Sequence, residues 1–310
     1  MINSLRQCCA IFTLVVCGAA TADDSVYIYV LGIAQDAGYP QTGCYQPHCL
    51  RAWEDKDLRR LTSSIAVVDE QSHSKYLFDA TPDMREQLYQ LHRVAPDEEY
   101  SLRGVFLTHG HIGHYTGLMH FGHEASSLRD VPVYAMPRMR EFLAASGPWD
   151  QLVRYRNIEL VGLQPNAGAT LTEYLSVIPF LVPHRDEYTE TVGFRIEGPG
   201  KSAVFIPDID KWDRWQVDIR DLIRSVDYAL LDATFFADGE LPGRDMSKIP
   251  HPFVAESMEL FADLSDAEKS RVIFIHLNHT NPLLIDGSPE QAIVTERGFR
   301  VAREGMRLDL

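Results

Sequence analysis

Short apolar runs recur along the chain, separated by polar or glycine-containing segments. Most runs are rich in Val, Ile, Leu, Phe and Tyr, which is typical of buried β-strands. Two consecutive runs flank a polar turn and predict a β-hairpin. The strands predicted in this way cover residues 25–32, 63–69, 75–80, 104–107, 131–135, 175–183, 192–196, 203–206, 228–231 and 271–275.

Helical segments alternate with the predicted strands. Segments 82–88 and 137–146 both begin with proline, and the first of them has acidic residues in its first turn. Both features favour the start of a helix. Segment 115–124 is a third predicted helix. The chain contains no internal repeat, low-complexity tract or linker, so the pattern predicts one α/β domain.

The first residues form a separate unit. Arg6 precedes an apolar stretch at 10–16, and residues 20–22 (Ala-Thr-Ala) are a small-residue cleavage pattern. The apolar stretch is shorter than the about 20 residues that a membrane-spanning helix needs. The segment therefore predicts a signal peptide at 1–22, a mature domain at 23–310, and a periplasmic or secreted protein.

The charge balance limits the kinds of molecule that the protein can bind. The chain has 29 Lys and Arg against 44 Asp and Glu, a formal net charge of −15. Loss of Arg6 with the signal peptide leaves 28 basic and 44 acidic residues, or −16. Such a surface repels the phosphates of nucleic acids and anionic lipids. With no later segment apolar enough to span a membrane, we expect a small-molecule substrate, no nucleic acid and no membrane span. The oligomeric state stays open.

Signal cleavage leaves Cys44 and Cys49 as the cysteines of the mature chain. In an oxidising compartment we expect them to form a disulfide across a tight loop. The alternative is a small structural metal site formed together with His48. A lipid anchor on Cys17 is a weaker alternative to signal cleavage, because the preceding Val16 is larger than the residue expected there.

A histidine-rich stretch follows the apolar run 104–107. His109, His111 and His114 fall within six residues, although only 12 histidines occur in the chain. In an extended chain His109 and His111 project to the same side, and Gly113 allows the backbone to turn before His114. Imidazole is the commonest protein ligand of zinc and similar metals. The stretch therefore predicts a metal site.

Potential ligands also follow several other predicted strands. A series of His and Asp residues at strand ends indicates that these ends converge on one edge of the fold. The long loop from Gly32 to Cys49 is expected near this site. The residues at the strand ends are Asp79, His109, His184, Asp208, Asp232 and His276. Carboxylates and imidazoles suit zinc, iron or manganese.

This arrangement resembles the metallo-β-lactamase fold superfamily, whose members are αββα sandwiches with metals at the edge between two β-sheets. The resemblance covers essentially the whole mature chain, because the motifs occur in the expected order. It is nearest to the branch of the pyrroloquinoline-quinone biosynthesis B proteins. The segments that carry the branch resemblance are 79–83, 206–210, 231–236 and 275–282.

The resemblance implies a centre for one or two metal ions. It assigns three imidazoles to the first ion and two to the second, with a bridging carboxylate, and it implies that Asp79 orients a ligand histidine. The implied ligands are His109, His111 and His184 for the first ion, His114 and His276 for the second, and Asp208 for both. Zinc is the expected metal, with iron or manganese as alternatives.

Gly113 departs from the family pattern His-x-His-x-Asp-His. The Asp of that pattern is a ligand of the second ion and a proton acceptor, and glycine can serve as neither. Asp186 is the preferred replacement, because in an extended chain it shares the side of His184. Glu187 and His279 are the alternatives. In the other interpretation, Asp186 and Glu187 form weak surface ion pairs with Arg185 or another base, and His279 is a hydrogen-bonded loop residue.

The resemblance predicts an exported hydrolase that uses a metal-bound hydroxide on an ester, lactone, amide or phosphodiester. We expect Asp208 to position the nucleophile and Asp186 or His279 to protonate the leaving group. His251 is a further candidate for a substrate contact or this proton transfer. One alternative is an iron-dependent oxygenase related to quinone-cofactor biosynthesis. Another is a metal-stabilised binding protein without turnover.

Overall fold

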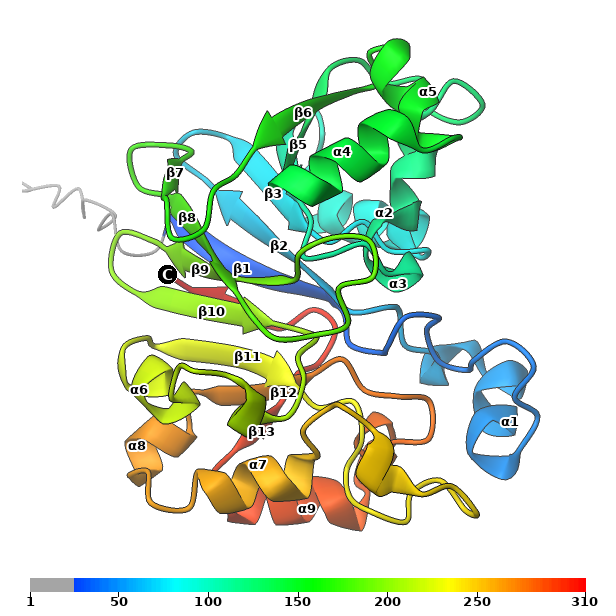
Figure 1. Cartoon of the computed structure of the whole chain (residues 1–310), viewed down its shortest axis with the longest axis vertical. Helices are drawn as coiled ribbons and strands as arrows, with labels where there is room; N and C mark the ends of the chain where they lie inside the picture. The colour runs from blue at the N-terminus through cyan, green and yellow to red at the C-terminus, as the bar shows by residue number, and fades with distance from the viewer. Residues whose placement is uncertain (1–24) are drawn as a thin grey trace, which may run out of the picture.

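The computed structural model describes residues 25–310. The predicted signal peptide at 1–22 and its cleavage site lie outside the described residues. Two seven-stranded β-sheets face each other, and helices cover the outer face of each sheet (Figure 1). This is an αββα sandwich, so the predicted fold class is confirmed.

The first sheet contains the N-terminal strands and one strand from the C-terminus. Strands β1 to β3 are antiparallel neighbours, and β3 to β6 run parallel. The predicted hairpin is β2–β3, in which Asp69 pairs with Ser74. In spatial order the strands are β14 (Arg307–Asp309), β1 (Val26–Gly32), β2 (Ser64–Asp69), β3 (Ser74–Phe78), β4 (Ser101–Phe106), β5 (Val131–Ala135) and β6 (Ile158–Gly162).

The second sheet is built from the C-terminal half. Strands β7 to β10 are antiparallel neighbours, and β10 to β13 run parallel. In spatial order the strands are β13 (Arg300–Val301), β12 (Val272–Ile275), β11 (Tyr228–Asp232), β10 (Ser202–Ile206), β9 (Val192–Glu197), β8 (Ser176–Leu181) and β7 (Ala169–Thr170).

The helices form the two outer layers. Figure 1 shows α2, α4 and α5 beside the first sheet, α6 to α9 beside the second, and α1 apart from both. No helix within residues 25–310 combines the length and apolar character needed to cross a bilayer. The helices are α1 (Pro47–Glu54), α2 (Met84–Val94), α3 (Ile112–Tyr115), α4 (Pro137–Ala145), α5 (Trp149–Arg154), α6 (Ile219–Arg224), α7 (Val254–Leu260), α8 (Asp266–Lys269) and α9 (Pro289–Glu296), with 3-10 helices η2 (Lys56–Leu58), η3 (Thr116–Phe121), η4 (Trp212–Arg214), η5 (Met246–Lys248) and η6 (Pro282–Leu284).

The helix expected at 115–124 is shorter and irregular. The chain forms α3 and then η3, which ends at Phe121. Here the backbone N–H of Gly117 donates a hydrogen bond to Ala80 O. A Cβ atom at Gly117 would lie 2.2 Å from Thr81 O. This close approach to the segment after β3 accounts for the departure from a regular helix.

Two buried clusters hold the layers together. The larger lies between the sheets and continues under α6, α7 and α9, with Phe78, Phe194 and Phe205 at its centre. The smaller joins the outer face of the first sheet to α2, α4 and α5 through side chains such as Leu91 and Leu143. Burial of these apolar faces is the dominant favourable contribution to folding. It fixes the strands whose ends carry the candidate site.

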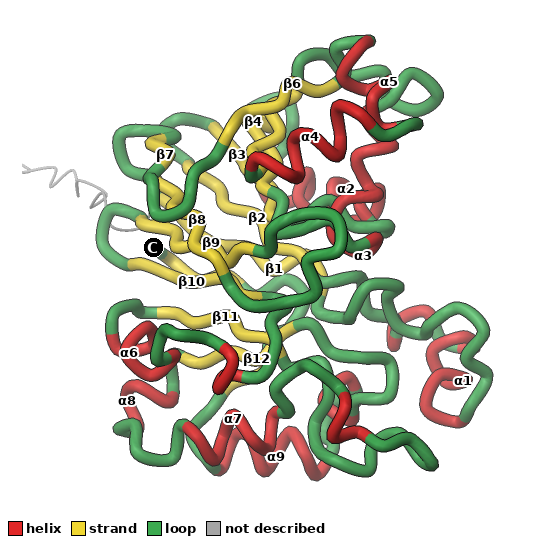
Figure 2. The backbone as a smooth tube through the Cα atoms, in the orientation of Figure 1, coloured by secondary structure: helices red, strands yellow, loops and turns green. Residues whose placement is uncertain are grey.

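The strand directions bring the predicted ligands to one edge. Strands β1, β3 and β4 run in the same direction in the first sheet, and β8, β10, β11 and β12 do so in the second. The segments that follow these strands, mostly loops drawn in green in Figure 2, carry the candidate metal ligands described below, with His114 in α3 and His48 and Cys49 in α1. Convergence of strand ends, as inferred from the sequence, therefore builds the site.

Candidate metal centre

Asp79 holds the histidine-rich loop against the end of β3. Its Oδ1 accepts hydrogen bonds from the backbone N–H and hydroxyl of Thr108, at 2.8 and 2.9 Å. Its Oδ2 accepts a hydrogen bond from His114 Nδ1 at 2.7 Å. One buried carboxylate thus joins the ends of two neighbouring strands and orients a histidine, which is the position expected for Asp79.

Four predicted ligands meet at one point, and we call them the first group: His109, His111, His184 and Asp208. His111 Nδ1 lies 2.9 Å from His109 Nε2 and 3.2 Å from His184 Nε2. Asp208 Oδ2 lies 3.4 Å from His109 Nε2 and 3.2 Å from His184 Nε2. The structure therefore brings together residues that lie up to 99 positions apart in the sequence, from 109 to 208.

The donor atoms of the first group lie close to the spacing expected of zinc ligands. Zinc binds nitrogen and oxygen at about 2.0–2.1 Å, which gives tetrahedron edges of about 3.3–3.4 Å. Four of the six separations lie between 2.9 and 3.4 Å, and all six are within 4.8 Å. Three imidazole nitrogens and a carboxylate oxygen are also donors that zinc accepts. The residues present therefore fit a zinc ion.

Asp36, His114 and His276 form the second group. Asp36 Oδ1 lies 3.3 Å from His114 Nε2 and 3.7 Å from His276 Nε2. All three atoms are buried, and none has a hydrogen-bond partner among the described residues. Leaving such an atom unpaired costs about 1–3 kcal/mol, so unpaired atoms are rare in native proteins. Three of them facing one another indicate a place for a cation.

Asp208 links the two groups. The same Oδ2 atom that completes the first group lies 3.8 Å from His114 Nε2. The carboxylate is almost fully buried. It therefore occupies the bridging position implied for it by the sequence, with the two groups on either side.

Every histidine of the two groups has an oxygen atom beside the ring nitrogen that faces away from the centre. Such contacts fix the ring orientation and leave the other nitrogen free to bind metal. The pairs are His109 Nδ1 with Thr108 Oγ1 at 3.0 Å, His111 Nε2 with Glu187 Oε2 at 3.1 Å, His114 Nδ1 with Asp79 Oδ2 at 2.7 Å, His184 Nδ1 with Asp210 Oδ1 at 3.3 Å, and His276 Nδ1 with Thr234 Oγ1 at 3.1 Å.

The local environment favours neutral His109 and ionised carboxylates, the forms that bind metal, whereas Asp79 and Asp36 raise the pKa of His114, and Asp208 raises that of His184, against the effect of burial. Burial, with His114 acting in the same direction, holds the pKa of His109 well below its usual value. Burial acts to raise the pKa of Asp208, but neighbouring histidines such as His184 outweigh it and hold that pKa well below its usual value. Burial also acts to raise the pKa of Asp36, but His114 and His276 outweigh it and hold that pKa well below its usual value.

His251 stands beside the centre with a carboxylate of its own. Its Nδ1 lies 2.9 Å from Asp232 Oδ2 and 3.2 Å from Asp208 Oδ1. The ring lies 5.6 Å from that of His184 and 6.4 Å from that of His276, centroid to centroid. His251 is therefore the one predicted proton donor that the structure brings to the centre.

Comparisons with known proteins agree with this geometry. A family model described as a β-lactamase superfamily domain matches residues 74–277. The chain belongs to the metallo-β-lactamase superfamily. Its relatives include coenzyme PQQ synthesis protein B of Methylobacterium radiotolerans, 30% identical over 91% of this chain and 99% of the relative. The same protein of Methylorubrum extorquens (strain PA1) is 29% identical over 92% of this chain and 100% of the relative.

Solved structures agree as well. Zn²⁺-bound PqqB from Methylobacterium extorquens superimposes with a TM-score of 0.77 and 26% identity, over 92% of this chain and 100% of that one. A diphosphatase from the PhnP family, at 23% identity, has a TM-score of 0.62 over 92% of this chain and 97% of that one. The second match shows the fold alone. This superfamily member thus lies in the branch of the PQQ synthesis B proteins.

The structure corrects the expected position of Asp186. Its carboxylate is 73% exposed and lies 3.5 Å from Arg138 Nη1. It takes part in none of the groups of candidate ligands found among residues 25–310. Glu187 instead faces His111 from the solvent side. The segment after His184 thus turns Asp186 towards solvent and Arg138, where it forms an ordinary surface ion pair.

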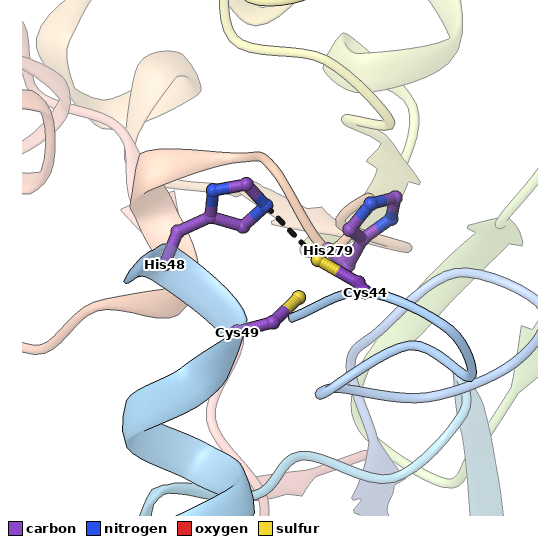
Figure 3. A group of neighbouring side chains, drawn as sticks. All are labelled: Cys44, His48, Cys49 and His279. Atoms are coloured by element: carbon purple, nitrogen blue, oxygen red, sulfur yellow. Dashed lines mark hydrogen bonds between the residues drawn. The ribbon is translucent and has the colours of Figure 1, made fainter. Parts of the chain in front are cut away.

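The structure also corrects the position of His279 and the pairing of the cysteines. Cys44 and Cys49 are free thiols, so the expected disulfide is absent. One donor atom from each of Cys44, His48, Cys49 and His279 lies within 4.8 Å of the others, and we call these four the cysteine–histidine group. Figure 3 shows the thiols between the two imidazoles, with Cys44 Sγ 3.4 Å from His48 Nε2.

The cysteine–histidine group fits the metal site that was the alternative to the disulfide. Two thiols and two imidazoles form a common zinc ligand set. Burial raises the pKa of Cys49 to about 12, so an ionised thiol there needs a cation beside it. His279 Nδ1 is buried without a hydrogen-bond partner in the described part of the chain. His279 thus belongs to this group and not to the centre.

The sequence reasoning missed Asp36 as a member of the centre. The residue follows β1, whose end lies at the same edge as the ends of β3 and β4. The loop from Gly32 to Cys49 was expected near the site, but nothing in its composition distinguished Asp36 from other loop acids. Asp210, which contacts His184, lies in segment 206–210, but the sequence did not indicate it as an orienting residue.

Proposed function

We propose that this protein is an exported zinc-dependent hydrolase of small-molecule esters, lactones, amides or phosphodiesters. The observation that carries the proposal is the close spacing of four zinc-binding donors in the first group, with Asp208 Oδ2 also 3.8 Å from His114 Nε2 of the second group. The zinc in the solved PqqB structure supports the choice of metal. Zinc bound at such a site lowers the pKa of a coordinated water towards about 7 and polarises the bond to be broken.

The chain's own residues supply positioning and proton transfer. Asp208, ionised and buried, presents oxygen atoms to both groups and to His251. His251 is held at Nδ1 by Asp232, whose own Oδ1 accepts hydrogen bonds from the N–H and hydroxyl of Thr234. This chain of contacts fixes the imidazole beside the reacting groups, where it donates a proton to the leaving group.

Elemental analysis of protein purified from its own periplasm tests the metal. We expect zinc in the centre, and turnover of at least one substrate in a panel of p-nitrophenyl esters, aryl phosphodiesters, lactones and amides. His251→Gln should lower kcat while zinc content stays at the wild-type value. Iron in place of zinc, with oxygen consumed during turnover, would replace the hydrolase by an oxygenase. Zinc without turnover of any substrate class would favour a binding protein.

The predicted export and signal cleavage are tested separately, by the mass of the mature chain. Intact-mass analysis of the periplasmic protein should give a chain that starts near Asp23, because residues 20–22 are the small-residue cleavage pattern. A retained Met1, or the added mass of a lipid on Cys17, would contradict cleavage at that position.

A further inference from the structure

Gly113 occupies the position where the superfamily pattern has an aspartate, and another residue fills its space. A Cβ atom at Gly113 would lie 2.5 Å from both Cα and Oδ1 of Asp36. Real Cβ atoms do not approach other atoms this closely, so an ordinary side chain at 113 requires the Asp36 segment to move. Position 113 is therefore glycine at a place where the loop after β1 comes against the histidine-rich loop.

The backbone holds Asp36 in this position. The Gln35 N–H donates a hydrogen bond to Leu277 O at 2.8 Å, and Asn278 Nδ2 donates one to Gln35 Oε1 at 2.5 Å. These bonds join the loop after β1 to the loop that carries His276. Asp36 itself has a φ of 26°, a conformation that a residue with a side chain rarely adopts. Such a backbone persists only where the surrounding contacts hold it.

The carboxylate of Asp36 completes the second group. Its Oδ1 is buried although the side chain as a whole is 45% exposed, and it faces His114 Nε2 and His276 Nε2. Asp208 Oδ2, 3.8 Å from His114 Nε2, would be a fourth donor beside these three, which is the number that zinc prefers. Without Asp36 the second ion would have three, and the centre would hold one carboxylate fewer.

We propose that Asp36 is a ligand of a second metal ion and supplies, from the loop after β1, the carboxylate that Gly113 cannot. The proposal deepens the proposed hydrolase function and rests on it. Each of the two positions explains the other: the carboxylate at 36 replaces the missing one, and glycine at 113 gives it room. The centre therefore keeps its usual charge and ligand number with a different chain segment as the source.

Zinc content per chain is the first measurement. Wild type, Asp36→Asn and the control Asp186→Asn are loaded with zinc, freed of loosely bound zinc by gel filtration and analysed by mass spectrometry of the elements. Asp36→Asn preserves shape and removes the charge, and it should lose one zinc per chain, with an affinity for the second ion lowered more than about 10-fold. Asp186→Asn, whose carboxylate is exposed, should retain the wild-type content.

The cysteine–histidine group lies on the same loop and is monitored separately. Cobalt(II) bound to thiolates absorbs in the near ultraviolet, so an unchanged thiolate band in cobalt-loaded Asp36→Asn assigns the lost ion to the centre. Loss of that band together with the zinc would show that the substitution disturbs the whole loop, and it would count against a ligand role for Asp36.

The second measurement uses variants in which the aspartate is moved from position 36 to position 113. Gly113→Asp alone should lower Tm, because its Cβ meets the Asp36 backbone. Asp36→Gly combined with Gly113→Asp should recover part of the lost Tm and the second zinc, because glycine at 36 removes the opposing Cβ and carboxylate and lets its backbone, whose Cα still lies 2.5 Å from the new Cβ, shift away. A folded double variant that does not regain the ion would overturn the equivalence of the two positions.

The outcomes separate this inference from the proposed function. Wild-type zinc content and affinity in Asp36→Asn, or a single zinc in the wild-type centre, would overturn the role of Asp36 while the hydrolase proposal stands. If His184→Ala leaves the zinc content unchanged, the metal centre itself fails, and with it the function.

Discussion

Two regions of the molecule offer metal ligands, and they differ in how those ligands are held. At the centre, five histidines each have an oxygen beside the second ring nitrogen. In the cysteine–histidine group, the donors are two thiols and two imidazoles, and His279 Nδ1 lacks a hydrogen-bond partner in the described chain. The centre is oriented by a surrounding shell of polar groups, whereas His279 in the other group has no such partner at Nδ1 among residues 25–310.

This difference matches the two kinds of zinc site. Four Cys and His ligands fill the coordination of zinc and make a site that contributes to folding. A centre of imidazoles and carboxylates that shares Asp208 between two ions suits catalysis, because its rings are oriented before substrate arrives. The two regions are nevertheless connected. Asp36 and Cys44 lie in one loop, and His276 and His279 in another.

The largest expected effect comes from removing a ligand of the first group. His184→Ala should lower zinc content by one ion per chain and reduce kcat/KM by more than about 100-fold, because loss of a ligand should exceed the effect of losing an orienting partner. His123→Ala, which removes an exposed histidine, is the matched control and should behave as wild type. Elemental analysis and a steady-state assay measure both. Equal zinc content in the two variants would contradict the assignment of His184.

Removing an orienting carboxylate should have a smaller effect, specific to one ion. Asp79 contacts His114 and Asp210 contacts His184. Asp79→Asn should therefore weaken the second ion, and Asp210→Asn the first, each by about 10–100-fold. Competition with a chromophoric chelator measures the two affinities. If both variants lose the same ion, these contacts do not orient the rings as inferred.

The cysteine–histidine group should act on the centre through the shared loops. Cys49→Ser should lose its zinc, lower Tm by several degrees, and weaken the second ion at the centre only several-fold, because Asp36 keeps its own contacts. Wild-type protein treated with a chelator until this zinc is lost is the control and should show the same Tm. An unchanged Tm in Cys49→Ser would mean that the group contributes nothing to stability.

The smallest effect is expected at Glu187. Its carboxylate is 48% exposed and lies 3.1 Å from His111 Nε2, and solvent screens such a pair. Glu187→Gln keeps an acceptor beside the ring and should change metal affinity and kcat/KM by less than about 3-fold. A loss as large as that of Asp210→Asn would show that solvent exposure does not distinguish the orienting residues.

The sequence by itself determined most of the architecture. The strands that became β1, β2, β3, β5, β9, β10 and β11 agree closely with the predicted ranges, because burial of alternating or continuous apolar residues is a local pattern. The same logic indicated the six polar residues at strand ends, four candidate ligands and two carboxylates that contact histidines, since polar residues after buried strands stand out from their surroundings.

Only the tertiary structure decided which further side chains join the centre. Asp186 and His279 each lie two or three residues beyond a ligand, and sequence distance favoured both. Instead Asp186 pairs with Arg138 at the surface, and His279 lies beside the two cysteines, which are far from it in the sequence. Asp36 is 77 positions from Gly113, yet its carboxylate fills the space beside that glycine. That contact depends on how β1 and the histidine-rich loop pack against each other, and no pattern within either segment specifies it.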